Sequence, residues 1–150
     1  GSIDADGNAR RQKGNAGVYV LGERSVYREP QDPERGLAMF ARVGLADSEL
    51  NPVGAYVGAG AVYTGLLRSR PDDQLGLGVA AAFAGHEFQD ASKEAGIDAD
   101  DAEVAIELTY RAQLTPWLAV QPDLQYIVNP SFDPSVEDAL ALGARFEVAF

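Results

Sequence analysis

The sequence contains no cysteine, one histidine (His86) and two lysines (Lys13 and Lys93). Without cysteine there can be no disulfide, no thiolate nucleophile and no Cys-type zinc site. A single histidine excludes a multi-histidine metal centre and leaves only one candidate for a Ser-His triad. We therefore expect no metal site.

Positive charge is scarce as well: 12 Lys and Arg residues against 23 Asp and Glu give a net charge of −11 over 150 residues. That field repels a phosphate backbone, which excludes nucleic acid as a partner. No apolar run approaches the roughly 18–20 residues of a membrane-spanning helix. A transmembrane strand needs only about 9–11 residues of alternating polarity, so a membrane location stays open.

Alternation with a period of two is what the sequence does contain. Within residues 102–114, aliphatic side chains and Tyr110 occupy every second position, and Glu103, Glu107 and Arg111 lie between them. A helix would mix these charges with the aliphatic residues, whereas a strand places them on opposite faces. Residues 102–114 are therefore predicted to form a half-polar strand.

Similar segments predict seven strands, centred near residues 22, 41, 60, 80, 108, 123 and 144. The phase of two of them is open. In Gly17–Glu29 each face carries a charge, and in residues 53–67 glycine and alanine blur the two faces. No helix is predicted, and residues 87–101 are expected to form a long acidic loop.

The connections are expected to alternate in length, as in outer-membrane barrels with short periplasmic turns and longer external loops. Counting back from the C-terminus assigns residues 68–73 and 115–116 to the periplasmic side. Loops 46–52, 87–101 and 129–137 then fall on the external side. The turn at residues 29–35 fits least well, because it is long for the periplasmic side.

Two interpretations of this pattern are open. A small soluble β-barrel that binds an apolar ligand would place its charged faces in water. A membrane barrel is favoured by the scarcity of lysine, by amides on the polar faces and by aromatic residues near the strand ends. These aromatic residues are Tyr27, Tyr63, Phe83, Tyr110, Trp117, Tyr126, Phe146 and Phe150.

Several ordered blocks over residues 14–150 resemble the OprB-type carbohydrate-selective porins. The blocks include RGLAMFARVG (35–44), DQLGLGV (73–79), LTPWLAVQPDLQYIVNP (114–130) and ALGAR (141–145). The resemblance implies an all-β fold: a Gram-negative outer-membrane barrel of sixteen antiparallel strands that passes small sugars by passive diffusion. It also implies that the protein is not an enzyme and needs no cofactor.

The resemblance covers only the C-terminal part of such porins. Residues 15–150 are expected to be about seven strands of that larger barrel, and residues 1–14 a loop-like N-terminal extension. Bacterial single-chain barrels have even strand numbers, and an open sheet in lipid would leave two unpaired edges. The N-terminal strands of the barrel are therefore expected partners, beside small sugars and outer-membrane lipid. A homo-oligomer is a further option.

The polar faces supply the candidate site, in which charged and amide groups would contact sugar hydroxyls along the pore. The candidates are Arg42, Glu103, Glu107, Arg111, Gln121, Asp123, Gln125, Arg145 and Glu147. The alternative is that these groups pair across strands and only stiffen the wall. A glycosidase pair is not indicated, because Glu103 and Glu107 would lie about 13 Å apart on one strand, beyond the roughly 5–9.5 Å such pairs need.

Overall fold

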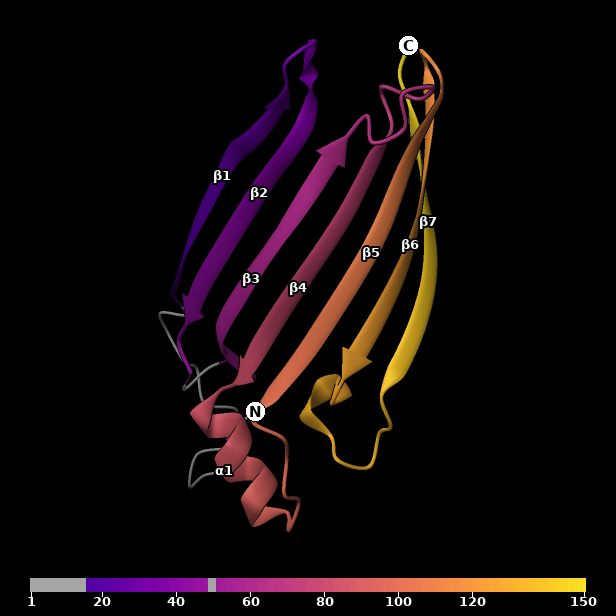
Figure 1. Ribbon diagram of the computed structural model, residues 1–150. Coiled ribbons are helices and arrows are strands. Elements are labelled where there is room, and N and C mark those ends of the chain that lie inside the picture. Colours follow the sequence, from indigo (N-terminus) through magenta and orange to yellow (C-terminus); the bar gives the residue numbers. More distant parts are fainter. Residues whose placement is uncertain (1–15, 49–50) are drawn as a thin grey trace.

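In the computed structural model, residues 16–48 and 51–150 are described, and they contain one seven-stranded antiparallel sheet (Figure 1). The strands are β1 (Gly17–Glu29), β2 (Asp32–Ala46), β3 (Val53–Thr64), β4 (Gln74–Ala84), β5 (Ala102–Thr115), β6 (Leu118–Val128) and β7 (Ala139–Val148). Each strand pairs with its neighbour in sequence, so the sheet order is β1 to β7. The prediction of seven antiparallel strands is confirmed, and the expected extension at residues 1–14 lies outside the described residues.

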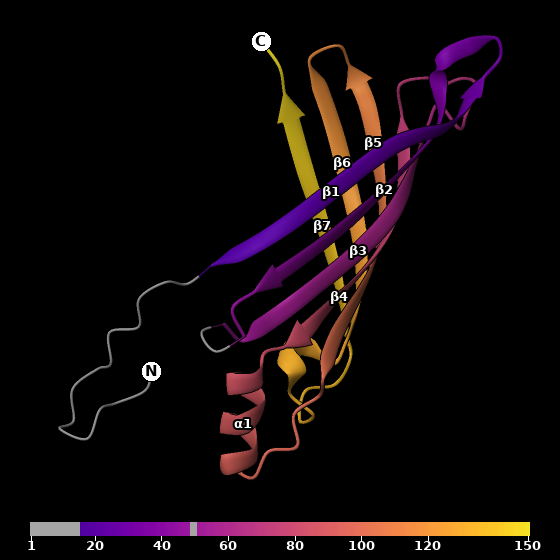
Figure 2. The ribbon, with the colours of Figure 1, turned by 90° about the vertical axis from the view of Figure 1, so that its left-hand side faces the viewer.

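The sheet has two open edges. β1 and β7 lie at its opposite ends in the strand order, and they do not pair with each other. The strands tilt and the sheet twists between these edges (Figures 1 and 2). The described residues thus form a curved sheet rather than the closed soluble barrel that the alternative interpretation required.

The connections divide between the two ends of the sheet as predicted. The β1–β2, β3–β4 and β5–β6 connections lie at the end that also holds the C-terminus (Figure 1). The β4–β5 and β6–β7 loops lie at the opposite end.

The first hairpin is tighter than the sequence indicated. We expected a long turn at residues 29–35, but Glu29 already pairs with Asp32, and the strands absorb the additional residues through register shifts near Ser25 and Arg28. Gly36 makes this possible, because its φ of +151° is disfavoured for other residues. A Cβ there would also lie 2.2 Å from the Tyr27 carbonyl oxygen. The turn that fitted the barrel pattern least is therefore short after all.

The prediction of no helix was wrong for the β4–β5 connection. Residues His86–Glu94 form helix α1, and a short 3₁₀ helix spans Pro130–Phe132. Helix α1 ends in a Schellman motif. Gly96 has a φ of +75°, its N–H donates to the Lys93 carbonyl, and the Ile97 N–H donates to the Ser92 carbonyl. With nine residues, the helix is too short to show a clear apolar period.

The sheet has almost no core of its own. Among the described residues, Ala119 and Phe132 are the only buried apolar side chains. On the apolar face large side chains stay open, with Leu142 82% and Phe146 68% exposed. Neither helix in the described part of the chain has the length and apolar character to cross a bilayer. The apolar face therefore requires an apolar environment outside the described sheet.

Candidate functional site

The strand register places all nine predicted site residues on one face of the sheet. Glu107 lies opposite Gln125, and Gln121 opposite Arg145. Directly opposed residues share a face, and every second residue of each strand joins them. The set comprises Arg42 on β2, Glu103, Glu107 and Arg111 on β5, Gln121, Asp123 and Gln125 on β6, and Arg145 and Glu147 on β7. We refer to this face as the polar face.

Part of this set pairs within the wall. Arg111 donates to one carboxylate oxygen of Glu147 from Nη2 at 2.8 Å and from Nε at 3.0 Å, reaching across β6. Glu103 accepts the backbone N–H of Ser131 at 2.6 Å and so contacts the β6–β7 loop. Gln125 donates to Asp123 at 3.5 Å. The structure therefore brings Arg111 and Glu147 together, while Glu103 holds the β6–β7 loop through its hydrogen bond with Ser131.

Two aromatic residues of the polar face, Phe40 and Tyr56, were not among the predicted site residues. Tyr56 lies opposite Gly44, two residues from Arg42. The Arg42 guanidinium carbon lies 4.5 Å from the centroid of the Tyr56 ring, and Arg42 also donates to the Tyr56 hydroxyl. Tyr56 was missed because glycine and alanine hide the phase of β3. The phase of β2, carried over through the hairpin register, could have placed it.

Aromatic residues line one end of the apolar face. The register runs in a single row through Tyr27, Leu37, Tyr63, Leu75 and Tyr110. The Tyr63 hydroxyl donates to Glu29 at 3.2 Å, so an apolar ring ends in a polar contact at the rim. This is the arrangement of an interfacial aromatic girdle.

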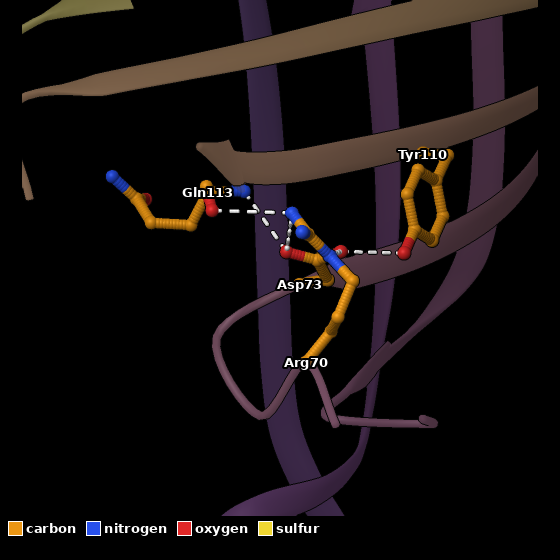
Figure 3. Close-up of polar contacts among 4 residues, drawn as sticks. All are labelled: Arg70, Asp73, Tyr110 and Gln113. Atoms are coloured by element: carbon orange, nitrogen blue, oxygen red, sulfur yellow. Dashed lines mark hydrogen bonds and ion pairs between the residues drawn. The ribbon is translucent and has the colours of Figure 1, made fainter. Parts of the chain in front are cut away.

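The same rim holds a buried carboxylate, Asp73, only 4% exposed. Its oxygens accept hydrogen bonds from the Gln113 backbone N–H at 2.9 Å, from Arg70 and from the Tyr110 hydroxyl (Figure 3). Arg70 also donates to the Gln113 carbonyl at 3.1 Å. The group ties the β3–β4 turn to the end of β5.

The charge state of Asp73 follows from these contacts. Burial alone would raise the pKa of its carboxyl group. The hydrogen bonds from Arg70, Tyr110 and Gln113 outweigh burial, so the pKa of Asp73 lies below its ordinary value of 3.8. Asp73 is consequently ionised at neutral pH, and its negative charge is matched by Arg70.

From β2 to β7, one face carries uncovered aliphatic and aromatic side chains and the other carries charges and amides. Together with the hairpin connections, these two faces define the wall of a transmembrane β-barrel. The sequence matches the family described as "Carbohydrate-selective porin, OprB family" over residues 2–150. The chain belongs to this family, which confirms the resemblance seen in the sequence. Its location is the outer membrane of Gram-negative bacteria.

Individual relatives agree with this assignment. The chain is 32% identical to Porin B of Pseudomonas aeruginosa over 158 residues, which is 96% of this chain and 35% of the relative. A high-pH structure of Pseudomonas putida OprB matches with a TM-score of 0.84 and 28% identity, covering 99% of this chain and 40% of that chain. A low-pH structure of the same protein gives a TM-score of 0.67 and 30% identity, with 89% and 36% covered. The chain thus spans about a third of the length of Porin B.

Proposed function

We propose that this chain supplies seven adjacent strands to the wall of a larger barrel, through which small carbohydrates diffuse passively. The observation that carries the proposal is the segregation of the two faces. The nine predicted charged and amide residues, which come from β2 and β5 to β7, share the polar face, and large apolar side chains cover the other face of these strands. The edge strand β1 departs from this segregation, because Leu21 lies opposite Arg42 on the polar face and Arg24 lies opposite Met39 on the apolar face. In a bilayer, only a closed sheet with the polar face toward a water-filled lumen satisfies both faces.

The open edges of β1 and β7 support a wall with further strands. Each edge carries N–H and C=O groups, and a group left unpaired in the hydrocarbon costs several kcal/mol. Seven strands are also an odd number, whereas bacterial single-chain barrels have even numbers. Additional strands pairing with β1 and β7 are therefore part of the proposal.

Sugar passage follows from the chemistry of the polar face. Sugar hydroxyls both donate and accept hydrogen bonds, and arginine, carboxylate and amide groups offer complementary partners. Flux requires that such binding is weak and spread over several sites. No reaction and no cofactor are proposed, and the wall's other contact is membrane lipid.

The direct test is swelling of liposomes that contain the full-length protein. Isotonic sugars of increasing size are added, and swelling is followed by light scattering. We expect rapid swelling with monosaccharides and slower swelling as the sugar grows. Liposomes carrying heat-denatured protein are the control. Equal swelling rates for the native and the denatured protein would refute sugar passage.

A further inference from the structure

The polar face contains a hollow that is formed jointly by residues of β2, β3, β4 and β5. In the register, Phe40 on β2 lies in one row with Gly60, Gly78 and Glu107. Because the two positions between Phe40 and Glu107 are glycines, no side chain separates the aromatic ring from the carboxylate. Two adjoining hollows of about 160 Å³ each are lined by Phe40, Gly78 and Glu107. We refer to them together as the glycine-floored hollow.

One wall of this hollow is aromatic. The Phe40 ring lies directly over Gly60, where a Cβ would approach the ring to 2.5 Å. The Tyr56 ring lies beside Gly58, where a Cβ would come within 2.9 Å of the tyrosine hydroxyl oxygen. The missing side chains thus give these rings room to lie along the sheet. Flat rings held in this way offer apolar surface to a ligand.

Arg42 is held at the same wall by two contacts with one residue. Its guanidinium stacks on the Tyr56 ring at 4.5 Å and donates to the hydroxyl of that ring. Cation–π stacking of this kind contributes to fixing an arginine. The remaining N–H groups of Arg42 stay directed donors in a fixed fork.

The opposite wall provides acceptors. Glu107 is half-buried, and within the described part of the chain it makes no hydrogen bond or ion pair. Thr109 and Gln121 line the hollow next to it. A ligand in the hollow would therefore meet an apolar ring and fixed donors on one side, and acceptors on the other.

We propose that the glycine-floored hollow is a monosaccharide-binding subsite within the pore. A pyranose has C–H groups that suit the Phe40 ring, and hydroxyls that can accept from Arg42 and donate to Glu107. Tyr56 is a positioning residue, since it acts through Arg42. The subsite deepens the proposed function and rests on it.

The test uses the full-length protein in planar lipid bilayers, with glucose as the probe. Glucose-dependent current noise gives a dissociation constant, and current in salt alone gives the conductance. Phe40→Ala and Glu107→Gln should each raise the dissociation constant about tenfold, the equivalent of roughly 1.4 kcal/mol. Met39→Ala is the matched control, because Met39 adjoins Phe40 on the opposite face, and its dissociation constant should equal that of the wild type.

The role of Tyr56 is tested by a double-mutant cycle. Tyr56→Phe keeps the ring and removes the hydroxyl that accepts from Arg42, so glucose binding should weaken. In an Arg42→Ala background the same change should have no further effect, because the group that Tyr56 positions is gone. A loss of equal size in both backgrounds would overturn the positioning role.

The subsite is overturned if Phe40→Ala and Glu107→Gln both bind glucose as the wild type does. It is also overturned if the wild type passes glucose without glucose-dependent noise. In these two outcomes the proposed function stands. If the wild type passes no sugar in liposomes, the proposed function and the subsite fail together.

Discussion

At the scale of single residues, the buried carboxylate of Asp73 shows how one charged group can stabilise the local fold. It is the one buried charged residue within residues 16–48 and 51–150, and three neighbours donate to it. A buried carboxylate is tolerated only when such partners replace its water. The β3–β4 connection thus depends on a charge held at the rim of the sheet.

Asp73→Asn tests this dependence. The change keeps the shape of the side chain but sets an amide against Arg70, so we expect the free energy of unfolding to fall by about 1.5–3 kcal/mol. The measurement is the temperature or urea concentration at which the full-length protein loses its heat-modifiable gel migration. Asp72→Asn, at the exposed neighbouring position, is the control. Equal shifts for both variants would show that Asp73 has no special role.

The pH dependence has a defined sign. The pKa of Asp73 is lower in the folded protein than its ordinary value of 3.8. Its stabilising contribution is therefore complete above about pH 4 and disappears as the pH falls through the lowered folded-state pKa. The stability difference between wild type and Asp73→Asn should shrink below about pH 4. A difference that stays constant down to pH 2 would contradict this assignment.

On the polar face, Arg145 of β7 lies opposite Gln121 of β6, and Arg111 of β5 lies on the other side of Gln121. We expect Arg111→Ala and Arg145→Ala to weaken sugar interaction about two- to tenfold and to shift ion selectivity toward cations. Heat-modifiable folding should be retained. Liposome swelling and reversal potentials measure the two effects, and Arg68→Ala, in the exposed β3–β4 turn, is the control. Unchanged flux and selectivity in both variants would make these arginines wall structure only.

At the scale of strands, the two faces of β5 should respond oppositely to the same substitution. Leu108 lies on the apolar face and Thr109 on the polar face. Leu108→Arg should destabilise the folded barrel by about 2–4 kcal/mol if it lies near the bilayer midplane. Thr109→Arg should fold normally and lower the salt conductance instead. The folding yield in detergent micelles is measured for both variants. Equal yields would contradict the assignment of the Leu108 face to lipid and of the Thr109 face to the lumen.

The strands differ in how well the sequence predicts them. In β5, the alternation of Glu103, Glu107 and Arg111 with aliphatic residues determines both the strand and its face. In β3, small residues on both faces give no hydrophobic contrast, so only the pairing with β2 shows where Tyr56 lies. Helix α1 depends on a tertiary contact, since Phe88 and Phe132 meet at 5.6 Å between two loops far apart in sequence. Local periodicity cannot reveal such a contact.

For the molecule as a whole, the open edges and the uncovered apolar face determine what the chain can do alone. We expect residues 1–150, expressed without further strands, to aggregate in buffer lacking detergent and to show no heat-modifiable band. The cause is the unpaired edge strands together with the exposed apolar face. Light scattering and gel migration, with the full-length protein in detergent as control, provide the measurement. A monodisperse chain in plain buffer would contradict the membrane-wall interpretation.

The glycines of the polar face also determine the width of the proposed pore, because they project no side chain into the lumen. A Cβ at Gly78 would meet no atom closer than the Ala59 carbonyl oxygen at 3.9 Å, whereas one at Gly60 would collide with the Phe40 ring. Position 78 can therefore accept alanine without displacing the wall, and we expect valine and leucine there to fill more of the passage in turn. Increasing the size of the side chain at position 78 on β4 should therefore reduce, step by step, the largest sugar that passes the pore.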